Sequence, residues 1–201
     1  MIGLDGQGLG AINSPVWFQY HRRWFWPEQV MELRRLARDV SEEEASTSGG
    51  DGPDVRKNKV RWLSREEDFR FVRPIQNHVF RAAGWDVDIR EIEPLQYTIY
   101  RETQDHYTWH SDDSGGSTAA PTGNIRKVTC VVQLSDPEDY DGCELELLTM
   151  RDNELRPVPI SFPKEAGSIV CFPSNAMHRV TPLTRGKRES LVCWFRGPPW
   201  R

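Results

Sequence analysis

Short candidate strands crowd the second half of this 201-residue chain, and they constrain its fold more than any other feature. They are rich in Val, Ile, Thr, Phe and Trp, and clusters of Asp, Gly, Pro and Ser separate them; the runs are 93–101, 127–135, 144–150, 167–174 and 189–196. Strands this short and this closely spaced are typical of a barrel or a sandwich rather than of alternating α/β units.

Two helical segments are predicted before these strands. Residues 27–40 open with a proline suited to a first turn and space their apolar residues as a helix does. Residues 65–84 show the same pattern, and Pro74 is expected to start or kink the later part. The segment between the two, 41–54, is acidic and rich in small turn residues, which is typical of a mobile loop.

The length predicts a single domain over residues 1–201, mainly β with supporting α. We expect residues 1–90 to form an N-terminal support of helices and strands, whose helices pack on one sheet, and residues 91–197 to form the barrel core. The N-terminal residues 1–15 have neither a positive start nor an apolar run, so neither a signal peptide nor an anchor is expected.

The net charge and the cysteines indicate which classes of partner and which compartment to expect. The formal net charge is −4, and no basic stripe favours nucleic acid or an anionic membrane as a partner. No apolar run approaches the roughly 18 residues of a transmembrane helix. The cysteines form no CxxC or Cys/His cluster, and we expect them to be reduced thiols packed as small hydrophobes in a cytoplasmic protein; they are Cys130, Cys143, Cys171 and Cys193.

A candidate metal site begins at His110 and Asp112. Two residues apart on an extended backbone, these side chains face the same side and can bind one cation. His178, which follows the candidate strand 167–174, offers a third ligand. Two histidines and one carboxylate with open positions form the facial triad of non-haem Fe(II) oxygenases. The alternative is a polar turn at 110–113 and a hydrogen-bonded surface histidine.

Arg188 argues for the metal site, because it opens an apolar strand shortly after His178. A guanidinium at the start of an inward-facing strand is costly unless an anion satisfies it, and its planar fork suits a carboxylate. An iron triad with a buried carboxylate-binding arginine describes a site for a dicarboxylate that chelates the metal at its other end. That description indicates 2-oxoglutarate.

Three segments carry a family resemblance: YRETQDHYTWHSD (100–112), RKVTCVVQLSDPEDYDGCEL (126–145) and AGSIVCFPSNAMHRVTPLTRGKRESLVCWF (166–195). They resemble the prolyl 4-hydroxylase-like branch of the Fe(II)/2-oxoglutarate-dependent dioxygenases, especially its small bacterial and phage members. The last segment is specific, since it joins a strand, FPS, His, VTP, RGxR and a terminal Trp in the family's order. The resemblance implies a double-stranded β-helix, or jelly-roll, barrel.

The resemblance also implies roles for single residues. His110, Asp112 and His178 match the iron ligands, and Arg188 matches the basic residue that pairs with the far carboxylate of 2-oxoglutarate. Tyr100 matches a tyrosine that reaches into the cosubstrate pocket, with packing on the barrel wall as the alternative.

Trp194 is expected either to line the same pocket or to pack only in the core.

The chain departs from the family at two places. Many relatives have a hydrogen-bonding tyrosine where this chain has Gln133, which can still donate to a carboxylate. The usual Gly-Gly is here Gly142 followed by Cys143, to which we assign no catalytic part.

The implied activity is hydroxylation of an aliphatic C–H with Fe(II), with 2-oxoglutarate and O2 as cosubstrates and ascorbate as an optional activator; succinate and CO2 are released. Asp112 favours hydroxylation, because related halogenases lack a carboxylate at that position. The expected prime substrate is a prolyl residue in a peptide or protein, with a free amino acid, a peptidyl natural product or another small molecule as alternatives. The expected location is the cytoplasm, of the host if the chain is phage-encoded.

Three other functions compete. A hydrolase could use Zn²⁺ on the same triad, but Arg188 would have no role. A non-catalytic barrel could bind a small acid through Arg188 without needing the triad. An oxygenase acting on alkylated nucleobases would have two arginines six apart after the distal histidine, whereas position 194 is Trp and the chain is acidic.

Two loops could border the substrate. Residues 41–58 are a lid over a peptide, as in related hydroxylases, or a solvated linker. Residues 114–124 directly follow the HxD pair and are placed to line the substrate mouth.

Overall fold

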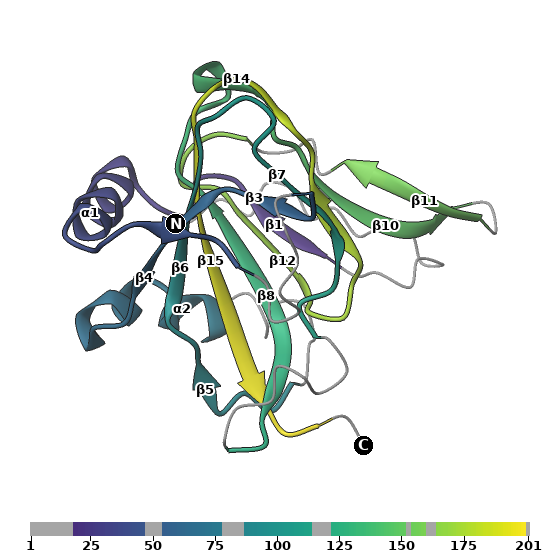
Figure 1. Ribbon diagram of the computed structural model, residues 1–201. Helices are drawn as coiled ribbons and strands as arrows, with labels where there is room; N and C mark the ends of the chain where they lie inside the picture. Colours follow the sequence, from purple (N-terminus) through teal and green to yellow (C-terminus); the bar gives the residue numbers. More distant parts are fainter. Residues whose placement is uncertain are drawn as a thin grey trace.

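The computed structural model describes residues 18–46, 54–77, 87–113, 122–151, 154–159 and 164–199. These residues form an antiparallel β structure with helices on one side of it (Figure 1). None of their helices combines the length and the apolar character needed to cross a membrane.

The larger sheet contains strands from both halves of the chain. Its order is β1 (Gln19–His21), β12 (Ile169–Pro173), β8 (Ile125–Gln133), β15 (Arg188–Gly197), β6 (Leu95–Tyr100), β4 (Lys59–Leu63) and β2 (Glu43–Glu44), and β5 (Glu91–Ile92) pairs with β15. Because β4 and β2 extend the edge beyond β6, the N-terminal region contributes strands to the sheet as well as helices against it.

The smaller sheet lies opposite the larger one and includes the strands that carry His110 and His178. Its order is β11 (Glu154–Pro159), β10 (Leu145–Arg151), β13 (His178–Val180), β7 (His106–His110) and β3 (Arg56–Lys57). Strands β14 (Leu183–Gly186) and β9 (Tyr140–Gly142) form a separate two-stranded sheet. A short 3-10 turn, Pro137–Asp139, directly precedes β9. The hairpin of β10 and β11 projects from the right-hand side of Figure 1.

The first predicted helix is confirmed, and in the second segment a new helix starts at Arg73, next to Pro74, as expected, while residues 78–84 lie outside the described residues. Helix α1 covers Pro27–Arg38. In the second segment a 3-10 helix covers Glu66–Phe71, and a new short helix, α2, covers Arg73–Ile75. Proline lacks the N–H that a continuing helix would bond, so Pro74 fits the first turn of α2 and breaks the longer helix.

The five predicted strand runs are confirmed as β6, β8, β10, β12 and β15, with ends shifted by a few residues. Strands β7 and β13 were not predicted. Both are short and mix polar with aromatic or apolar residues, so they lack the longer apolar run that marks the other strands. The centre of the possible lid, residues 47–53, and the loop 114–121 lie outside the described residues.

Strands β6, β8 and β15 are buried on both faces, and successive side chains point to opposite faces of a strand. One face packs against the helices in a cluster that includes Leu95, Val132, Leu191, Leu33 of α1 and Leu63 of β4. The other face looks toward the smaller sheet, where a second cluster includes Tyr100, Val131, Leu147, Phe172 and Val180. Every second residue of these strands therefore faces the space between the sheets.

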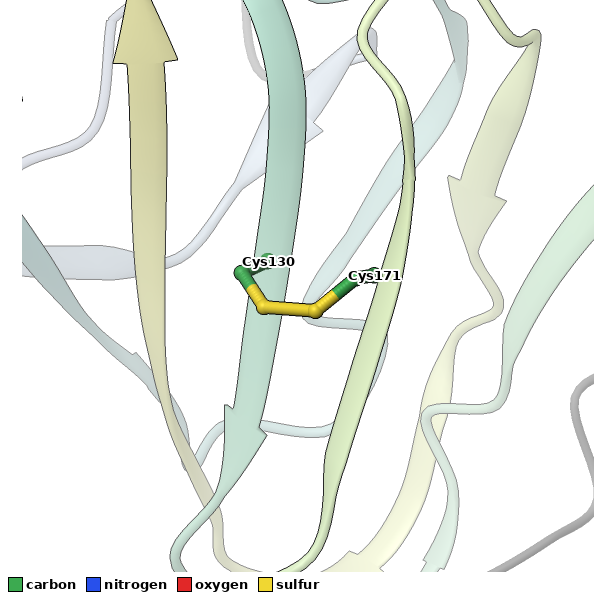
Figure 2. Close-up of a disulfide and its surroundings, with 2 residues drawn as sticks. All are labelled: Cys130 and Cys171. Atoms are coloured by element: carbon green, nitrogen blue, oxygen red, sulfur yellow. A yellow bond between two sulfur atoms is a disulfide. The ribbon is translucent and has the colours of Figure 1, made fainter. Parts of the chain in front are cut away.

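The prediction of reduced thiols is wrong for Cys130 and Cys171, which form a disulfide between β8 and β12 (Figure 2). The two residues are directly paired across the antiparallel strands, and their Cα atoms lie 4.2 Å apart. Strand pairing thus brings together thiols 41 residues apart in sequence. Cys143 and Cys193 are free and buried, as expected.

This pairing predicts a thiol count. Iodoacetamide added to the denatured, unreduced protein should alkylate Cys143 and Cys193, and all four cysteines should react only after reduction. Peptide mass spectrometry measures the modification, with the two free thiols as internal controls. Alkylation of Cys130 and Cys171 without a reductant would contradict the disulfide.

Candidate active site

The side chains of His110, Asp112 and His178 converge between the two sheets, as the sequence predicted. One potential ligand atom from each lies within 4.8 Å of the others. His110 ends β7 and His178 starts β13, and the two residues are directly paired across these strands. Asp112 follows β7, and its backbone N–H donates to the Ser174 carbonyl oxygen at 2.8 Å, which fixes the turn after the strand.

Both histidines are oriented by their own backbone. The Nδ1 atom of His110 lies 2.8 Å from the Thr108 carbonyl oxygen, and that of His178 lies 2.9 Å from the Ala176 carbonyl oxygen. A carbonyl oxygen only accepts, so each Nδ1 carries the proton and each Nε2 keeps a lone pair. The two Nε2 atoms lie 3.8 Å and 3.5 Å from oxygens of Asp112, so all three residues offer ligand atoms to one point.

The Asp112 carboxylate is held from the opposite sheet. Thr129 of β8 donates a hydrogen bond of 2.6 Å from Oγ1 to Oδ2 of Asp112. The same hydroxyl lies 3.0 Å from the Ser174 hydroxyl. Hydrogen bonds of this kind fix the orientation of a metal-binding carboxylate. Thr129 therefore couples the candidate ligand set to the main sheet.

Electrostatics keep the cluster in a metal-binding protonation state. Burial, and then the neighbouring His178, lower the pKa of His110 to about 3. Burial alone would raise the pKa of Asp112, but His178, His110 and Arg126 together hold it below its usual value. At neutral pH the site therefore presents a neutral imidazole at His110 beside a carboxylate. This donor set fits a divalent transition metal that binds nitrogen and oxygen ligands.

One cavity is lined both by this cluster and by Arg188. Alternate residues of the strands buried on both faces form much of its wall: Gln96, Thr98 and Tyr100 of β6, Thr129 and Val131 of β8, and Arg188, Ser190, Val192 and Trp194 of β15. Gln96, Thr98, Thr129, Ser190 and Val192 were not among the predicted site residues. Counting in twos along each strand from Tyr100, Gln133 and Arg188 would have found them.

Arg188 occupies the end of the cavity away from Asp112. Its side chain is 1% exposed, and it donates from Nη2 to the Gln133 carbonyl oxygen Oε1 at 3.1 Å. Its Nε is buried and has no hydrogen-bond partner. Among the described residues no carboxylate pairs with it, although a buried guanidinium stays charged and needs an anion.

The remaining predicted residues occupy different parts of the site. Tyr100 lies opposite Arg188 in the strand pairing and lines the cavity, and burial raises the pKa of its hydroxyl. Gln133 is buried beside Arg188 and accepts its hydrogen bond. Trp194 also lines the cavity, but it pairs with Thr129 at the metal end, six residues along β15 from Arg188 and so about 20 Å away at the rise of a strand.

The smaller sheet adds cavity residues that were not predicted, among them Tyr107 and Arg56. The ring of Tyr107 stacks on that of His110 at 3.4 Å between centroids, and the Arg56 guanidinium lies 4.5 Å above the Tyr107 ring. Arg56 also donates to the side-chain oxygens of Asn58 and Gln96. No sequence motif marks Arg56, because β3 is only two residues long.

Comparison with known sequences gives the same family as the site. Residues 95–196 match the 2OG-Fe(II) oxygenase superfamily. A PKHD-type hydroxylase of Janthinobacterium sp. (strain Marseille) is 30% identical over 178 residues, which cover 85% of this chain and 74% of that protein.

Solved structures show the same fold. A prolyl-4-hydroxylase of Pseudomonas putida aligns with a TM-score of 0.67 at 20% identity, covering 90% of this chain and 92% of that one. A prolyl hydroxylase of Trichoplax adhaerens, in complex with a peptide fragment of a hypoxia inducible factor, aligns with a TM-score of 0.64 at 17% identity, covering 89% and 82%. The predicted jelly-roll, or double-stranded β-helix, fold is thereby confirmed. The chain belongs to the 2OG-Fe(II) oxygenase superfamily, as a hydroxylase that depends on Fe(II), 2-oxoglutarate and O2.

Proposed function

We propose that this protein hydroxylates prolyl residues in a peptide or protein, with Fe(II) bound by His110, Asp112 and His178 and with 2-oxoglutarate held between the metal and Arg188. The observation that carries the proposal is the uncompensated charge of Arg188 in the same cavity as the His/Asp/His cluster. An oxygenase of this family needs both a metal site and a carboxylate site, and the cavity offers one at each end.

The distance between the two ends suits one small ligand. Thr129, which contacts Asp112, and Gln133, which contacts Arg188, are four residues apart on β8, or about 13 Å at the rise of a strand. The bound metal and the long Arg188 side chain would bridge part of this separation, and a five-carbon dicarboxylate would bridge the rest.

Each residue would have a distinct task when the metal and cosubstrate bind. Bound iron supplies oxidative decarboxylation of the cosubstrate and oxygen transfer to an aliphatic C–H. His110 and His178 would donate their Nε2 lone pairs, and Asp112 would add a negative charge that Thr129 keeps in place. Arg188 would bind the distal carboxylate, and Tyr100 would line the path between them. The protein would thus fix the positions of the metal and the cosubstrate, and would keep water away from the buried Arg188 end of the cavity.

The prime substrate is inferred from the relatives and from the open end of the cavity. Relatives include prolyl hydroxylases, and one of them is a complex with a peptide. At the metal end, Trp194 and Tyr107 line the cavity with aromatic side chains. Aromatic side chains suit contact with the apolar pyrrolidine ring of proline. A free amino acid or another small molecule remains the alternative substrate class.

The competing functions account for fewer of these observations. A zinc hydrolase on the same triad would leave Arg188 without a task, and a binding barrel would leave the convergent triad without one. Membership of the 2OG-Fe(II) oxygenase superfamily favours a function that needs both the metal end and the Arg188 end of the cavity.

Mass spectrometry of a peptide digest tests the reaction. Cell lysate incubated with the protein, Fe(II), ascorbate and 2-oxoglutarate should gain peptides in which a proline carries one added oxygen atom. Asp112→Ala should abolish both this product and succinate release, because the metal loses its only carboxylate ligand. His106→Ala is the matched control, since His106 lies on the same strand outside the cluster.

Either of two results would contradict the proposal. Normal succinate production by Asp112→Ala would remove the metal assignment. Oxygen addition to free amino acids alone, with no modified peptide, would replace the prolyl substrate by the small-molecule alternative.

The proposed role of Arg188 is tested by measuring the KM for 2-oxoglutarate in Arg188 variants. Arg188→Ala should raise the KM for 2-oxoglutarate far more than that for the prime substrate, because a buried carboxylate would lose its partner at a cost of about 3–5 kcal/mol. Arg188→Lys should fall between Arg188→Ala and the parent protein, because an ammonium lacks the fork. Fe(II) binding should stay intact in both variants.

Arg185→Ala serves as the control, because Arg185 is exposed on β14 and pairs with Asp141 at the surface. A normal KM for 2-oxoglutarate in Arg188→Ala would refute the carboxylate site.

A further inference from the structure

A buried hydroxyl on β6 lines the cavity without a hydrogen-bond partner. Thr98 is 1% exposed, and no group among the described residues bonds to its Oγ1. Its neighbours along the strand, Tyr97 and Ile99, pack in the helix-side cluster, so Thr98 belongs to the set of alternate residues that faces inward. Burying a hydroxyl without a partner is costly, and valine would fill a similar space without that cost. A threonine at this position therefore indicates a ligand that accepts its hydrogen bond.

The strand register places Thr98 beside Arg188. Ser190 of β15 is paired with Thr98 on one side and with Gln133 of β8 on the other, so these three residues form one row across the larger sheet. Arg188 lies two residues before Ser190, so its side chain starts on the same face of the sheet. Its Nη2 donates to Oε1 of Gln133 at 3.1 Å. The guanidinium therefore reaches toward the row to which Thr98 belongs.

The guanidinium of Arg188 is also held near β6, the strand that carries Thr98. Its central carbon lies 5.5 Å from the centroid of the Tyr100 ring, and Tyr100 is two residues from Thr98 on β6. Thr98 and Arg188 are diagonal neighbours in the pairing of β6 with β15, which puts them about 7–8 Å apart, within reach of a long side chain. A carboxylate bound to the guanidinium can therefore also contact the Thr98 hydroxyl.

We propose that the Thr98 hydroxyl donates a hydrogen bond to the distal carboxylate of 2-oxoglutarate, beside the ion pair with Arg188. The inference deepens the proposed function and rests on the binding of that carboxylate by Arg188. It adds a cosubstrate contact that the family resemblance did not imply. Nε of Arg188 is also buried without a partner, so one carboxylate would satisfy two donors that the protein leaves unpaired.

The chemistry of the two groups sets the size of the effect. An ionised carboxylate only accepts hydrogen bonds, so the hydroxyl is the donor. A hydrogen bond to a charged group contributes roughly 10- to 150-fold to an equilibrium constant. Thr98→Val keeps the branched shape of the side chain and removes only the donor. A loss of affinity in this variant would therefore report the hydrogen bond rather than a change in packing.

The test measures dissociation constants by calorimetry, on Fe(II)-loaded protein without oxygen. Two ligands are compared: 2-oxoglutarate, and 2-oxopentanoate, which has a methyl group in place of the distal carboxylate. Thr98→Val should bind 2-oxoglutarate roughly tenfold more weakly than the parent protein and 2-oxopentanoate equally well. Thr98→Ser keeps the hydroxyl, so it should retain the parent preference for 2-oxoglutarate.

Thr184→Val is the matched control, because Thr184 is exposed on β14 and outside the cavity lining. Thermal unfolding without ligands supplies a second measurement. Thr98→Val should unfold at the parent Tm or above it, because valine removes a buried hydroxyl that has no partner. A lower Tm would mean that the hydroxyl bonds within the protein, which would overturn the inference.

The outcomes separate this inference from the proposal beneath it. If Arg188→Ala weakens 2-oxoglutarate binding but Thr98→Val binds it as the parent does, the role of Thr98 is refuted alone. The same follows if Thr98→Val weakens both ligands equally, or if Thr98→Ser or Thr184→Val loses as much affinity for 2-oxoglutarate as Thr98→Val does. A normal 2-oxoglutarate affinity in Arg188→Ala would overturn the carboxylate site and this inference together.

Discussion

The site depends on strands that are buried on both faces. In β6, β8 and β15 one set of alternate residues packs against α1 and its neighbours, and the other set faces the smaller sheet. The helix-side set is apolar, as in Leu191, Cys193 and Phe195. The inward set mixes apolar and polar residues, and a buried polar group is costly unless it finds a partner. Pairing of these strands therefore fixes both the core and the positions of the polar groups in the cavity.

This arrangement explains how the cavity can hold opposite charges at its two ends. Asp112 accepts a hydrogen bond from Thr129 and interacts with the charged Arg126, so its charge is partly compensated within the protein. Among the described residues Arg188 donates to the neutral Gln133 amide and pairs with no carboxylate, so its charge awaits a ligand. A ligand that binds the native state alone also stabilises it, so metal and cosubstrate would add to the stability of the sheets that present them.

The long apolar strands, α1 and the convergence of His110, Asp112 and His178 could be predicted from the sequence, because each has a local signal. Strands β7 and β13 were not predicted, because both are short and mix polar with aromatic or apolar residues. The disulfide between Cys130 and Cys171 depends on a strand register that sequence spacing does not give. Thr129 was not predicted as a site residue for the same reason, since it contacts Asp112 from a distant segment.

The central claim is that one cavity binds the metal at His110, Asp112 and His178 and the distal carboxylate at Arg188. A crystal structure of the protein grown without oxygen, with Fe(II) and 2-oxoglutarate, tests it most directly. We expect the metal to be bound by both Nε2 atoms and an Asp112 oxygen, with the far carboxylate of the cosubstrate hydrogen-bonded to Nε of Arg188. A metal bound elsewhere, or a cosubstrate whose far carboxylate avoids Arg188, would contradict the account.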